Sequence, residues 1–489
     1  MRLVKLGMAN VDSTVGAVRS NVDRMVALAE QLTAEGVTVA VFPEQAIGGY
    51  APEDLVQWRA RVEARLAGPA SFAQRTRDSS TAFAVGVTAS VGGDLFNCAA
   101  MVHRGRVLGL IPKEKLPTYN VFYEARTFSR GVAGLSLACR GIPLGDFVFA
   151  FDFGTVALEV CEDIWSPDGP MRRRAYSGAE LVCNLSASPY RAGIAGTRHE
   201  MIATRAADNQ STVVYANLVG ANDGLIFDGG GVINQNGRPV ARGARFREGI
   251  TTAVVDLDRT TRSRREATTW RSDLERFRQT ERTVTVICAS EPGADRSGLQ
   301  YPAPAAGTTF FLPSAKRAEL SPRDELLDEM FDALALGVAG YFKKTGAFRR
   351  IGVAISGGRD SLLTLLVAHR ALRLLHPDES DEAFRANAAD RLQTFFMPSR
   401  FSSQATEDAA RTIAEDLGAR FEVVSIEEAF ARELEATRAM LGGEEPTEIT
   451  KQNIQARLRG QRMWNWANTS GALFLQTGNM SEKSVGYTT

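Results

Sequence analysis

The sequence predicts a layered α/β protein of two or three domains, and three observations support that prediction. Its length of 489 residues exceeds a single ordinary domain of roughly 100–200 residues. Over residues 1–290, short apolar runs alternate with stretches of helical spacing, a pattern typical of layered α/β folds. Beyond a segment rich in Pro and Gly, another apolar run leads straight into the glycine-rich residues 356–361 and an apolar helix.

The expected strands of the N-terminal region are short and apolar throughout, as in strands buried inside a fold. They are residues 37–42, 83–87, 155–160, 181–185 and 212–219. Ahead of them, residues 20–35 have helical spacing, with Val22, Val26, Ala29 and Leu32 on one face. We therefore expect residues 1–290 to form one α/β domain.

The chain then changes character. Residues 291–322 contain EPGADRSG, YPAPAAG and SP, and Pro and Gly at that density predict a linker. Residues 323–489 form the second expected domain. Its expected elements are a helix at 324–343, a strand at 351–355, a helix at 362–375 and a helix at 447–462.

Composition excludes several classes of function. Lys plus Arg and Asp plus Glu each total 57, so net charge gives no sign of a nucleic acid or a membrane as partner. The 5 cysteines are scattered without a CxxC pair, which argues against a disulfide framework and structural zinc. No apolar stretch reaches 18 residues. We expect a soluble, cytoplasmic protein.

Three candidate catalytic groups follow probable strand ends in the N-terminal region. Glu44 ends the run VAVFPE, Lys113 and Lys115 lie in IPKEKLPTY, and Cys161 opens CEDIW. A thiol at its usual pKa of about 8.5 is a poor nucleophile, but a neighbouring carboxylate can take its proton. A lysine can stabilise the oxyanion that forms when an amide is attacked. The set therefore supports amide hydrolysis through a thioester, without a histidine.

The order of these motifs and the residues within them carry more information than each motif alone. FPE, KxxLPTY, CEDIW and CNLSASPY together resemble the nitrilase superfamily of amidases, and most specifically the glutaminase domain of glutamine-dependent NAD synthetases. The resemblance implies a nitrilase-type α-β-β-α sandwich. It also implies that Glu44 is the general base, Lys113 rather than Lys115 the oxyanion-stabilising lysine, Cys161 the nucleophile, and Glu124 a second glutamate that orients the lysine.

The same resemblance implies a binding site for glutamine. Tyr119 and Ser188 match positions that hold this substrate in the family. The family usually has a basic residue six positions after that serine, where this chain has Ile194. Arg198 or Arg191 is expected to take that role through a different loop path.

The C-terminal motif SGGRDS predicts a phosphate site. Gly357 and Gly358 let the backbone approach a phosphate closely, and the helix that follows directs N–H groups at an anion. Ser356 and Ser361 add hydroxyl donors. Asp360 would repel phosphate unless a cation intervened, which suggests Mg²⁺. The motif differs from the ordinary P-loop, which ends in Gly-Lys-Ser or Gly-Lys-Thr.

A strand, SGGxDS and a helix resemble the ATP pyrophosphatase family, which implies a doubly wound parallel sheet and ATP as a substrate. Two later segments, 450–460 and 476–487, resemble NAD synthetases in particular. By that resemblance Asn453 and Arg457 bind nicotinic acid adenine dinucleotide, and Thr477 contacts ATP. Glu482 joins Asp360 around Mg²⁺.

Both halves together imply a glutamine-hydrolysing NAD synthetase. Ammonia released from glutamine at Cys161 would amidate adenylated nicotinic acid adenine dinucleotide, giving NAD, AMP and pyrophosphate. A homo-oligomer is expected. Family members continue beyond the segment at which residue 489 lies, so the second domain is expected to be incomplete at its C-terminus. Two alternatives stay open: a stand-alone nitrilase-family amidase with a vestigial ATP-binding domain, and a non-catalytic nucleotide-binding subunit.

Overall fold

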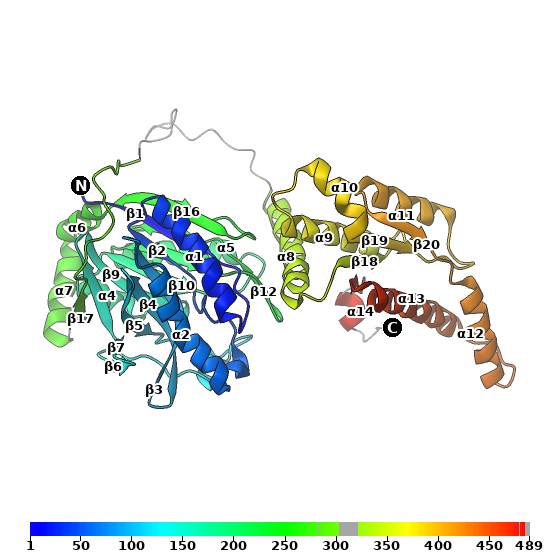
Figure 1. Ribbon diagram of the computed structural model, residues 1–489, viewed down its shortest axis with the longest axis horizontal. Helices are drawn as coiled ribbons and strands as arrows, with labels where there is room; N and C mark the ends of the chain where they lie inside the picture. Colours follow the sequence, from blue (N-terminus) through cyan, green and yellow to red (C-terminus); the bar gives the residue numbers. More distant parts are fainter. Residues whose placement is uncertain (282, 303–320, 479, 485–489) are drawn as a thin grey trace. The chain divides into compact units, whose positions relative to one another are not determined.

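The computed structural model describes residues 1–281, 283–302, 321–478 and 480–484, and Figure 1 shows the course of the chain. Its internal contacts divide it into two units, Met1–Leu327 and Asp328–Thr489. Of the expected linker 291–322, residues 303–320 lie outside the described part. Each unit has its own sheets and its own core.

The first unit is built on two mixed β-sheets. The eight-stranded sheet has the order β16 (Gly249–Asp256), β1 (Leu3–Asn10), β2 (Val39–Val41), β3 (Ala82–Val91), β4 (Asp94–His103), β5 (Arg106–Pro112), β7 (Ile142–Gly145) and β6 (Ser136–Cys139). The seven-stranded sheet has the order β15 (Arg238–Arg242), β14 (Val232–Gln235), β11 (Thr212–Asn217), β10 (Leu181–Ser186), β9 (Gly154–Val160), β8 (Phe147–Phe151) and β17 (Thr285–Cys288). A separate hairpin pairs β12 (Val219–Asn222) with β13 (Leu225–Asp228).

Helices cover the outer faces of both sheets. Those on the eight-stranded sheet are α1 (Val18–Ala34) and α2 (Arg59–Arg75), and those on the seven-stranded sheet are α3 (Glu162–Trp165), α4 (Met171–Tyr176) and α5 (Ile194–Asp208). Two more helices, α6 (Leu257–Glu266) and α7 (Thr268–Thr280), pack on each other. One apolar core lies between the two sheets, and each sheet shares another with its helices. The predicted α-β-β-α sandwich is confirmed.

Burial on both faces explains why the strands are apolar throughout rather than alternating. On β2, Val39 and Val41 face the core between the sheets, whereas Ala40 and the following Phe42 face the helices. Successive side chains of a strand point to opposite faces. Both faces of this strand are therefore apolar because neither meets water.

The expected strand at 212–219 differs from the structure. β11 ends at Asn217, whose buried side-chain amide donates to the carbonyls of Ser188 and Gly229 at 3.1 Å each. The chain then leaves the sheet, and β12 pairs with β13. The apolar run continued across this change of direction, so hydrophobicity alone gave no sign of it.

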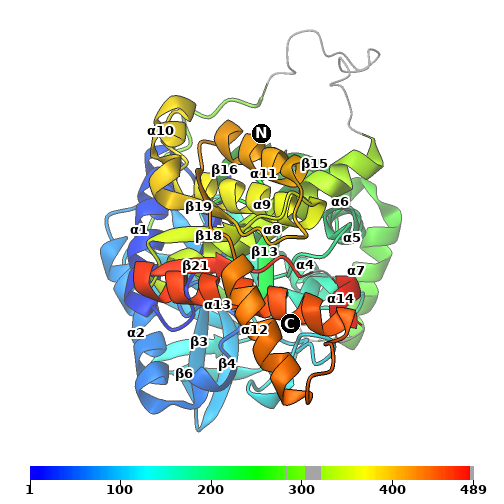
Figure 2. The same ribbon diagram turned by 90° about the vertical axis from the view of Figure 1, so that its right-hand side faces the viewer.

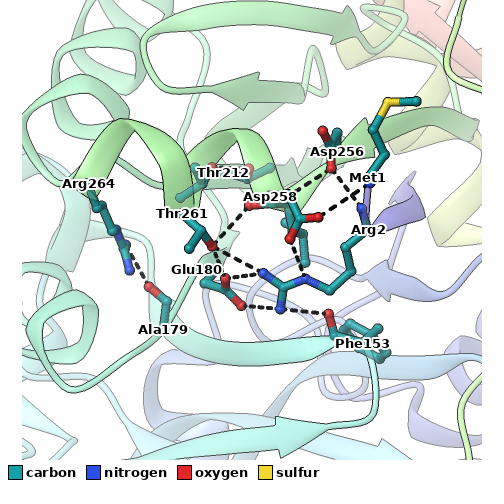
Figure 3. Close-up of polar contacts among 12 residues, drawn as sticks. Met1, Arg2, Phe153, Ala179, Glu180, Thr212, Asp256, Asp258, Thr261 and Arg264 are labelled. Carbon is teal, nitrogen blue, oxygen red and sulfur yellow. Dashed lines mark hydrogen bonds and ion pairs between the residues drawn. The ribbon is translucent and has the colours of Figure 1, made fainter. Parts of the chain in front are cut away.

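A polar cluster ties the start of the chain to both sheets (Figure 3). Arg2 pairs with Glu180, which precedes β10, and its Nε donates to Asp258 at 3.2 Å. The backbone N–H of Arg2 donates to the Asp256 carboxylate at 2.9 Å, and the Thr261 hydroxyl donates to Glu180 at 2.7 Å. Asp256 also caps the start of α6 through the N–H of Asp258. The cluster therefore joins β1, the approach to β10 and α6.

The second unit is a parallel sheet in the order β20 (Arg420–Val423), β19 (Leu392–Phe396), β18 (Arg350–Ala354) and β21 (Ala472–Leu475). Its helices are α8 (Pro322–Thr345), α9 (Arg359–Leu375), α10 (Asp381–Arg391), α11 (Gln404–Asp416), α12 (Glu427–Met440), α13 (Glu448–Ser470) and α14 (Met480–Ser484). None of the helices in the described ranges has the length and apolar character needed to cross a membrane.

Helices cover both faces of this parallel sheet. On β19, Leu392 and Phe396 pack with α9, α10 and α11, whereas Phe395 packs with Met463 of α13. Figure 2 shows α13 lying beside β21. The arrangement is the doubly wound sheet that the sequence predicts.

The contact between β18 and α13 gives a prediction about stability. A Cβ on Gly352 would lie 2.1 Å from Cζ3 of Trp466, so Gly352→Ala should destabilise the second unit by about 1–3 kcal/mol through overpacking. Gly460 on α13 has nothing within 4 Å of the same position. Gly460→Ala is the control and should be neutral or stabilising by up to ~1 kcal/mol, since glycine is unfavourable inside a helix. Thermal unfolding compares the two variants, and equal Tm values would contradict the packing described.

Candidate active site

The chain turns sharply at Cys161, between the end of β9 and the start of α3. Its φ of +43° is positive, which is costly for a residue with a Cβ and persists only where the surrounding structure holds it. The backbone N–H of Cys161 donates to the carbonyl of Leu185 on β10, at 2.9 Å. The thiol is buried, with 4% of the residue exposed. The turn is thus held by the seven-stranded sheet.

A buried lysine between two glutamates lies at this turn. Lys113 follows β5, and its Nζ donates to Oε1 of Glu44 and to Oε1 of Glu124, each at 2.7 Å. The side chains of Lys113 and Glu44 are fully buried, and that of Glu124 is 4% exposed. A buried ammonium group is stable only when paired. The two carboxylates therefore fix where the cation lies.

Further bonds hold the two glutamates from both sheets. Oε1 of Glu44 also accepts from the side-chain amide of Asn97 on β4 at 2.7 Å. Its Oε2 accepts from the backbone N–H of Ala187, beyond β10, at 2.9 Å. The hydroxyl of Tyr50 donates to Glu124 at 2.8 Å. Glu44 thus bridges the eight-stranded sheet to the seven-stranded sheet beside the cysteine.

The charges of this cluster act on one another. Burial raises the pKa of Cys161 well above its ordinary value, Glu44 raises it further, and Lys113 opposes the rise. Burial alone would lower the pKa of Lys113, but Glu124 and Glu44 outweigh it and raise that pKa well above the usual range. Burial also raises the pKa of Glu124, against the effect of Lys113. At neutral pH Cys161 is therefore a thiol and Lys113 a cation.

Tyr119 and Ser188 are the two residues predicted to hold glutamine. The Tyr119 hydroxyl donates to Glu162, next to Cys161, at 2.9 Å, and half of Tyr119 is exposed. Burial, Glu162 and the nearby Cys161 raise the pKa of Tyr119 to about 12. Ser188 is buried beyond β10, where its backbone N–H donates to the side-chain oxygen of Asn217 at 2.8 Å. Contact of either residue with a substrate of Cys161 stays a prediction.

Arg198 is buried, and its guanidinium donates hydrogen bonds to other groups of the protein. Nε donates to the Ser188 hydroxyl at 3.2 Å, Nη1 to Asp228 at 2.7 Å, and Nη2 to the carbonyls of Ser188 and Pro189 at 3.0 and 3.1 Å. Direct contact between Arg198 and glutamine stays a prediction, and it would require one of these bonds to open. Arg191, in the loop before α5, is exposed.

The SGGRDS motif forms a tight turn between β18 and α9. The Ser361 hydroxyl accepts from the N–H of Ser356 at 3.1 Å and donates to the Gly358 carbonyl at 2.9 Å. Gly357 has φ +79°, and a Cβ there would lie 2.3 Å from the carbonyl oxygen of Thr406. The turn thus requires glycine, and it brings the start of α9, with Asp360 in its first turn, to the end of β18.

The other predicted residues of the second unit lie near the same edge of its sheet. β18 and β21 are adjacent parallel strands, so the segments after them leave at the same edge. Thr477 follows β21, and Glu482 lies on α14. Asn453 and Arg457 lie one turn apart on α13, which is anchored to the segment after β19 by a bond between Gln455 and Ser399.

A Mg²⁺ site is compatible with this donor set. Mg²⁺ is commonly held by one or two carboxylates together with phosphate oxygens and waters. In the described ranges no group of three or more His, Cys, Asp or Glu side chains is arranged to hold a metal. Asp360 and Glu482 would therefore need phosphate oxygens to complete a site, which is the usual situation for Mg²⁺ bound with ATP.

Some residues of the first site were not identified from the sequence. Asn97 and Tyr50 contact the two glutamates directly. Asp163, two residues after the cysteine, is buried and accepts backbone N–H bonds. A signal existed for Asn97, because it is a polar residue in the otherwise apolar run 95–102. Tyr50 carries no comparable signal.

Comparison with known proteins places both units in families. The carbon-nitrogen hydrolase model matches residues 5–265, and the NAD synthase model matches residues 330–489. The glutamine-dependent NAD(+) synthetase of Aquifex aeolicus is 32% identical over 491 residues, which cover 100% of this chain and 77% of the relative. That of Thermotoga maritima is 30% identical over 496 residues, covering 100% and 76%.

Solved structures agree with this assignment. The glutamine-dependent NAD+ synthetase of Acinetobacter baumannii, in complex with adenosine diphosphate, has a TM-score of 0.75 and 26% identity, covering 100% of this chain and 77% of that one. The enzyme of Cytophaga hutchinsonii has a TM-score of 0.77 and 23% identity, with coverage of 100% and 76%, and it supports the fold. The chain thus spans about three quarters of the length of these relatives. It belongs to the glutamine-dependent NAD(+) synthetases, a family of carbon–nitrogen ligases.

Proposed function

We propose that Cys161, Glu44 and Lys113 carry out the glutamine-hydrolysing half of NAD synthesis. The observation that supports this assignment is the buried ion cluster beside the cysteine turn. Lys113 lies 2.7 Å from each of two carboxylates, and its side chain is fully buried. Such a cation is placed to stabilise negative charge that develops during a reaction.

In the first step the Cys161 sulfur attacks the side-chain amide carbon of glutamine. Because burial keeps Cys161 a thiol, its proton leaves as the carbon–sulfur bond forms, and the Glu44 carboxylate accepts it. The carbonyl oxygen becomes an oxyanion, which the Lys113 ammonium stabilises. Glu44 then returns the proton to the leaving nitrogen, the carbon–nitrogen bond breaks, and ammonia departs.

A thioester on Cys161 remains after ammonia has left. A water molecule attacks its carbonyl carbon while Glu44 takes one of the water protons, and Lys113 again faces the oxyanion. The carbon–sulfur bond breaks, the sulfur regains a proton from Glu44, and glutamate is released. Glu124 and its partner Tyr50 keep the Lys113 cation in one place through both steps.

Recognition of glutamine is assigned to Tyr119, which bonds Glu162 next to Cys161, and to Ser188, which follows the end of β10. We propose that Arg198 acts on the substrate through Ser188, since it bonds both the hydroxyl and the carbonyl of that residue. Arg191 is the exposed basic residue on the same loop, and it is the remaining candidate for direct contact with the glutamine carboxylate.

ATP and nicotinic acid adenine dinucleotide are assigned to the second unit. The SGGRDS turn would bind the phosphates of ATP through Ser356, Ser361 and the N–H groups at the start of α9, with Thr477 nearby. Asn453 and Arg457 on α13 would bind the dinucleotide. The complex of the Acinetobacter baumannii relative with adenosine diphosphate supports a nucleotide site. ATP would adenylate the carboxylate of the dinucleotide with loss of pyrophosphate, and ammonia would displace AMP.

Mg²⁺ is assigned to Asp360 and Glu482. When bound there with ATP, it would neutralise phosphate charge and make pyrophosphate a better leaving group. The two carboxylates follow neighbouring strands of the parallel sheet, which supports a shared ligand.

The remaining features of the protein are proposals of the same kind. A glutaminase domain at 1–290, a linker at 291–322 and a synthetase domain at 323–489 agree with the two family matches. A homo-oligomer is also proposed, and the exposed apolar side chains Met330, Leu334 and Tyr341 of α8 and Leu363 of α9 are compatible with it. The five free cysteines suit the reducing cytoplasm.

The nucleophile gives the first test of these assignments. Cys161→Ala should abolish glutamine hydrolysis, because loss of a covalent nucleophile costs on the order of 10⁶ in turnover in a well-studied hydrolase. NAD formation from ammonium should persist, since that half lies in the other unit. Cys288→Ala is the control, as Cys288 is exposed and far from the chemistry in sequence. Release of glutamate by Cys161→Ala at the normal rate would refute the assignment.

The two neighbouring lysines separate the oxyanion role from general effects of charge. Lys113→Met should lower glutaminase turnover by at least about 10²–10³-fold, the usual effect of losing an oxyanion stabiliser. Lys115→Met should have a mild effect. Steady-state kinetics of glutamate release compare them, with thermal unfolding as a check that each variant is folded. A reversed ranking would mean that Lys115 is the catalytic lysine.

The metal assignment is tested by ATP binding. Chelation of Mg²⁺ should weaken ATP binding to the normal protein by about tenfold or more, the size of one charged contact. Asp360→Asn should bind ATP weakly with or without Mg²⁺. Asp378→Asn, exposed after α9, should behave as the normal protein. Titration calorimetry measures each case, and ATP binding that is insensitive to chelation would contradict the proposal.

A further inference from the structure

The cysteine and the lysine of the proposed glutaminase site are carried by different sheets. Lys113 is held by the eight-stranded sheet, where its backbone N–H donates to the carbonyl of Asn97 on β4 at 2.8 Å. Cys161 is held by the seven-stranded sheet through its bond to Leu185. A reaction that needs both groups therefore requires the ends of two sheets to keep a fixed separation.

One buried carboxylate joins these two segments. Oδ1 of Asp163 accepts the backbone N–H groups of Glu114 at 3.0 Å and Lys115 at 2.9 Å, directly after Lys113. Its Oδ2 accepts the N–H of Val160 at 3.0 Å, directly before Cys161. Asp163 is 1% exposed. The same side chain thus contacts the backbone beside each of the two reactive residues.

We propose that Asp163 is a positioning residue that sets the distance between Lys113 and Cys161, through its bonds to the backbone of both segments. The inference rests on the proposed roles of those two residues. Both carboxylate oxygens of Asp163 accept backbone N–H groups, so we assign Asp163 no contact with the substrate.

Burial and the neighbouring groups set the charge state of Asp163. Burial raises its pKa to about 6, although the N–H bonds oppose the rise. With a folded-state pKa above the unfolded value, the folded state binds the proton more tightly. The stability of the folded protein therefore decreases as pH rises from the unfolded-state pKa of Asp163 through its folded-state pKa. The ionised form of Asp163 at neutral pH is thus less favourable for folding than the protonated form. Among the charged groups around it, Arg174 favours the carboxylate and Glu114 opposes it.

A second link between the same two segments makes a folded variant attainable. Arg174 donates to the carbonyl of Leu158 on β9 and, through Nη2, to the side chain of Glu114 at 3.2 Å. Burial and the nearby Asp163 raise the pKa of Glu159 to about 8, and Arg174 opposes the rise. Without the Asp163 carboxylate the segments would stay close but lose their common anchor.

Asp163→Asn is the direct test. The amide presents an NH₂ group in place of one oxygen, so either Val160 or the pair Glu114 and Lys115 loses its acceptor. A displacement of about 1 Å can cost on the order of 10²-fold in rate. Glutaminase kcat should therefore fall by about 10- to 100-fold, with KM within about threefold. Asp168→Asn, an exposed position shortly after α3, is the matched control and should leave both constants unchanged.

The pH dependence of Cys161 alkylation by iodoacetamide separates positioning from simple loss of charge. Removing a negative charge near the thiol would lower its pKa and speed alkylation at a given pH. Moving Lys113 away would raise that pKa and slow alkylation, because Lys113 lowers it in the intact site. We expect slower alkylation in Asp163→Asn, with a profile displaced to higher pH. Faster alkylation, or unchanged kcat, would overturn the proposal.

A second variant covers the case in which Asp163→Asn does not fold. Asp163→Ser leaves space in which water can satisfy the three N–H groups, and it should show the same loss of kcat and the same direction of the alkylation shift. Normal kcat in that variant would overturn the proposal.

Cys161→Ala, assayed in parallel, distinguishes failure of the proposed function from failure of the positioning role. Glutamine hydrolysis by Cys161→Ala would refute the proposed function, whereas an inactive Cys161→Ala with a fully active Asp163→Ser would refute only the positioning role.

Discussion

The proposed glutaminase site depends on one buried ion cluster, in which Lys113 lies between Glu44 and Glu124. Taking three charged groups out of water costs several kcal/mol for each ion unless the charges are paired and hydrogen-bonded. Here Nζ of Lys113 lies 2.7 Å from a carboxylate oxygen of each glutamate. Asn97, Ala187 and Tyr50 donate further hydrogen bonds to the two glutamates. A cation held in this way cannot turn toward solvent. In the proposed reaction it would present its charge where the oxyanion forms.

The cluster and the cysteine beside it depend on both sheets of the first unit. Glu44, Lys113 and Cys161 follow β2, β5 and β9, and the last of these strands belongs to the other sheet. Packing of the two inner faces brings the strand ends together, and bonds between the sheets fix their separation. The hydrogen bond from the backbone N–H of Ala187 to the Glu44 carboxylate is one of them. A strained backbone at Cys161 is tolerated because the surrounding structure holds it from both sides.

Much of this could be predicted from the sequence, and the reasons differ by element. The apolar runs around Val39–Val41 and Leu181–Ser186 predicted buried strands because both faces of these strands avoid water. The end of β11 at Asn217 was missed, since the apolar run continues while the chain changes direction. Motif order identified Glu44, Lys113 and Cys161 as candidates, but spacing in sequence carries no information about bonds between distant segments. The contacts of Asn97 and the three bonds of Asp163 therefore became visible only in the fold.

The second unit extends the same reasoning to nucleotide chemistry. Gly357 was predicted from its place in a phosphate-binding motif, and the structure adds a physical reason, because a Cβ would meet the backbone of Thr406. The parallel sheet brings the segments after β18 and β21 to one edge, where Asp360 and Glu482 follow them.

The central claim is that Cys161 forms a covalent thioester with glutamine under the control of this ion cluster. Rapid acid quenching during turnover of isotope-labelled glutamine, followed by peptide mass spectrometry, tests it directly. The account predicts a labelled γ-glutamyl group on the peptide that contains Cys161 and on none of the peptides that contain the other four cysteines. Turnover with an unlabelled Cys161 peptide, or with the label on another cysteine, would contradict it.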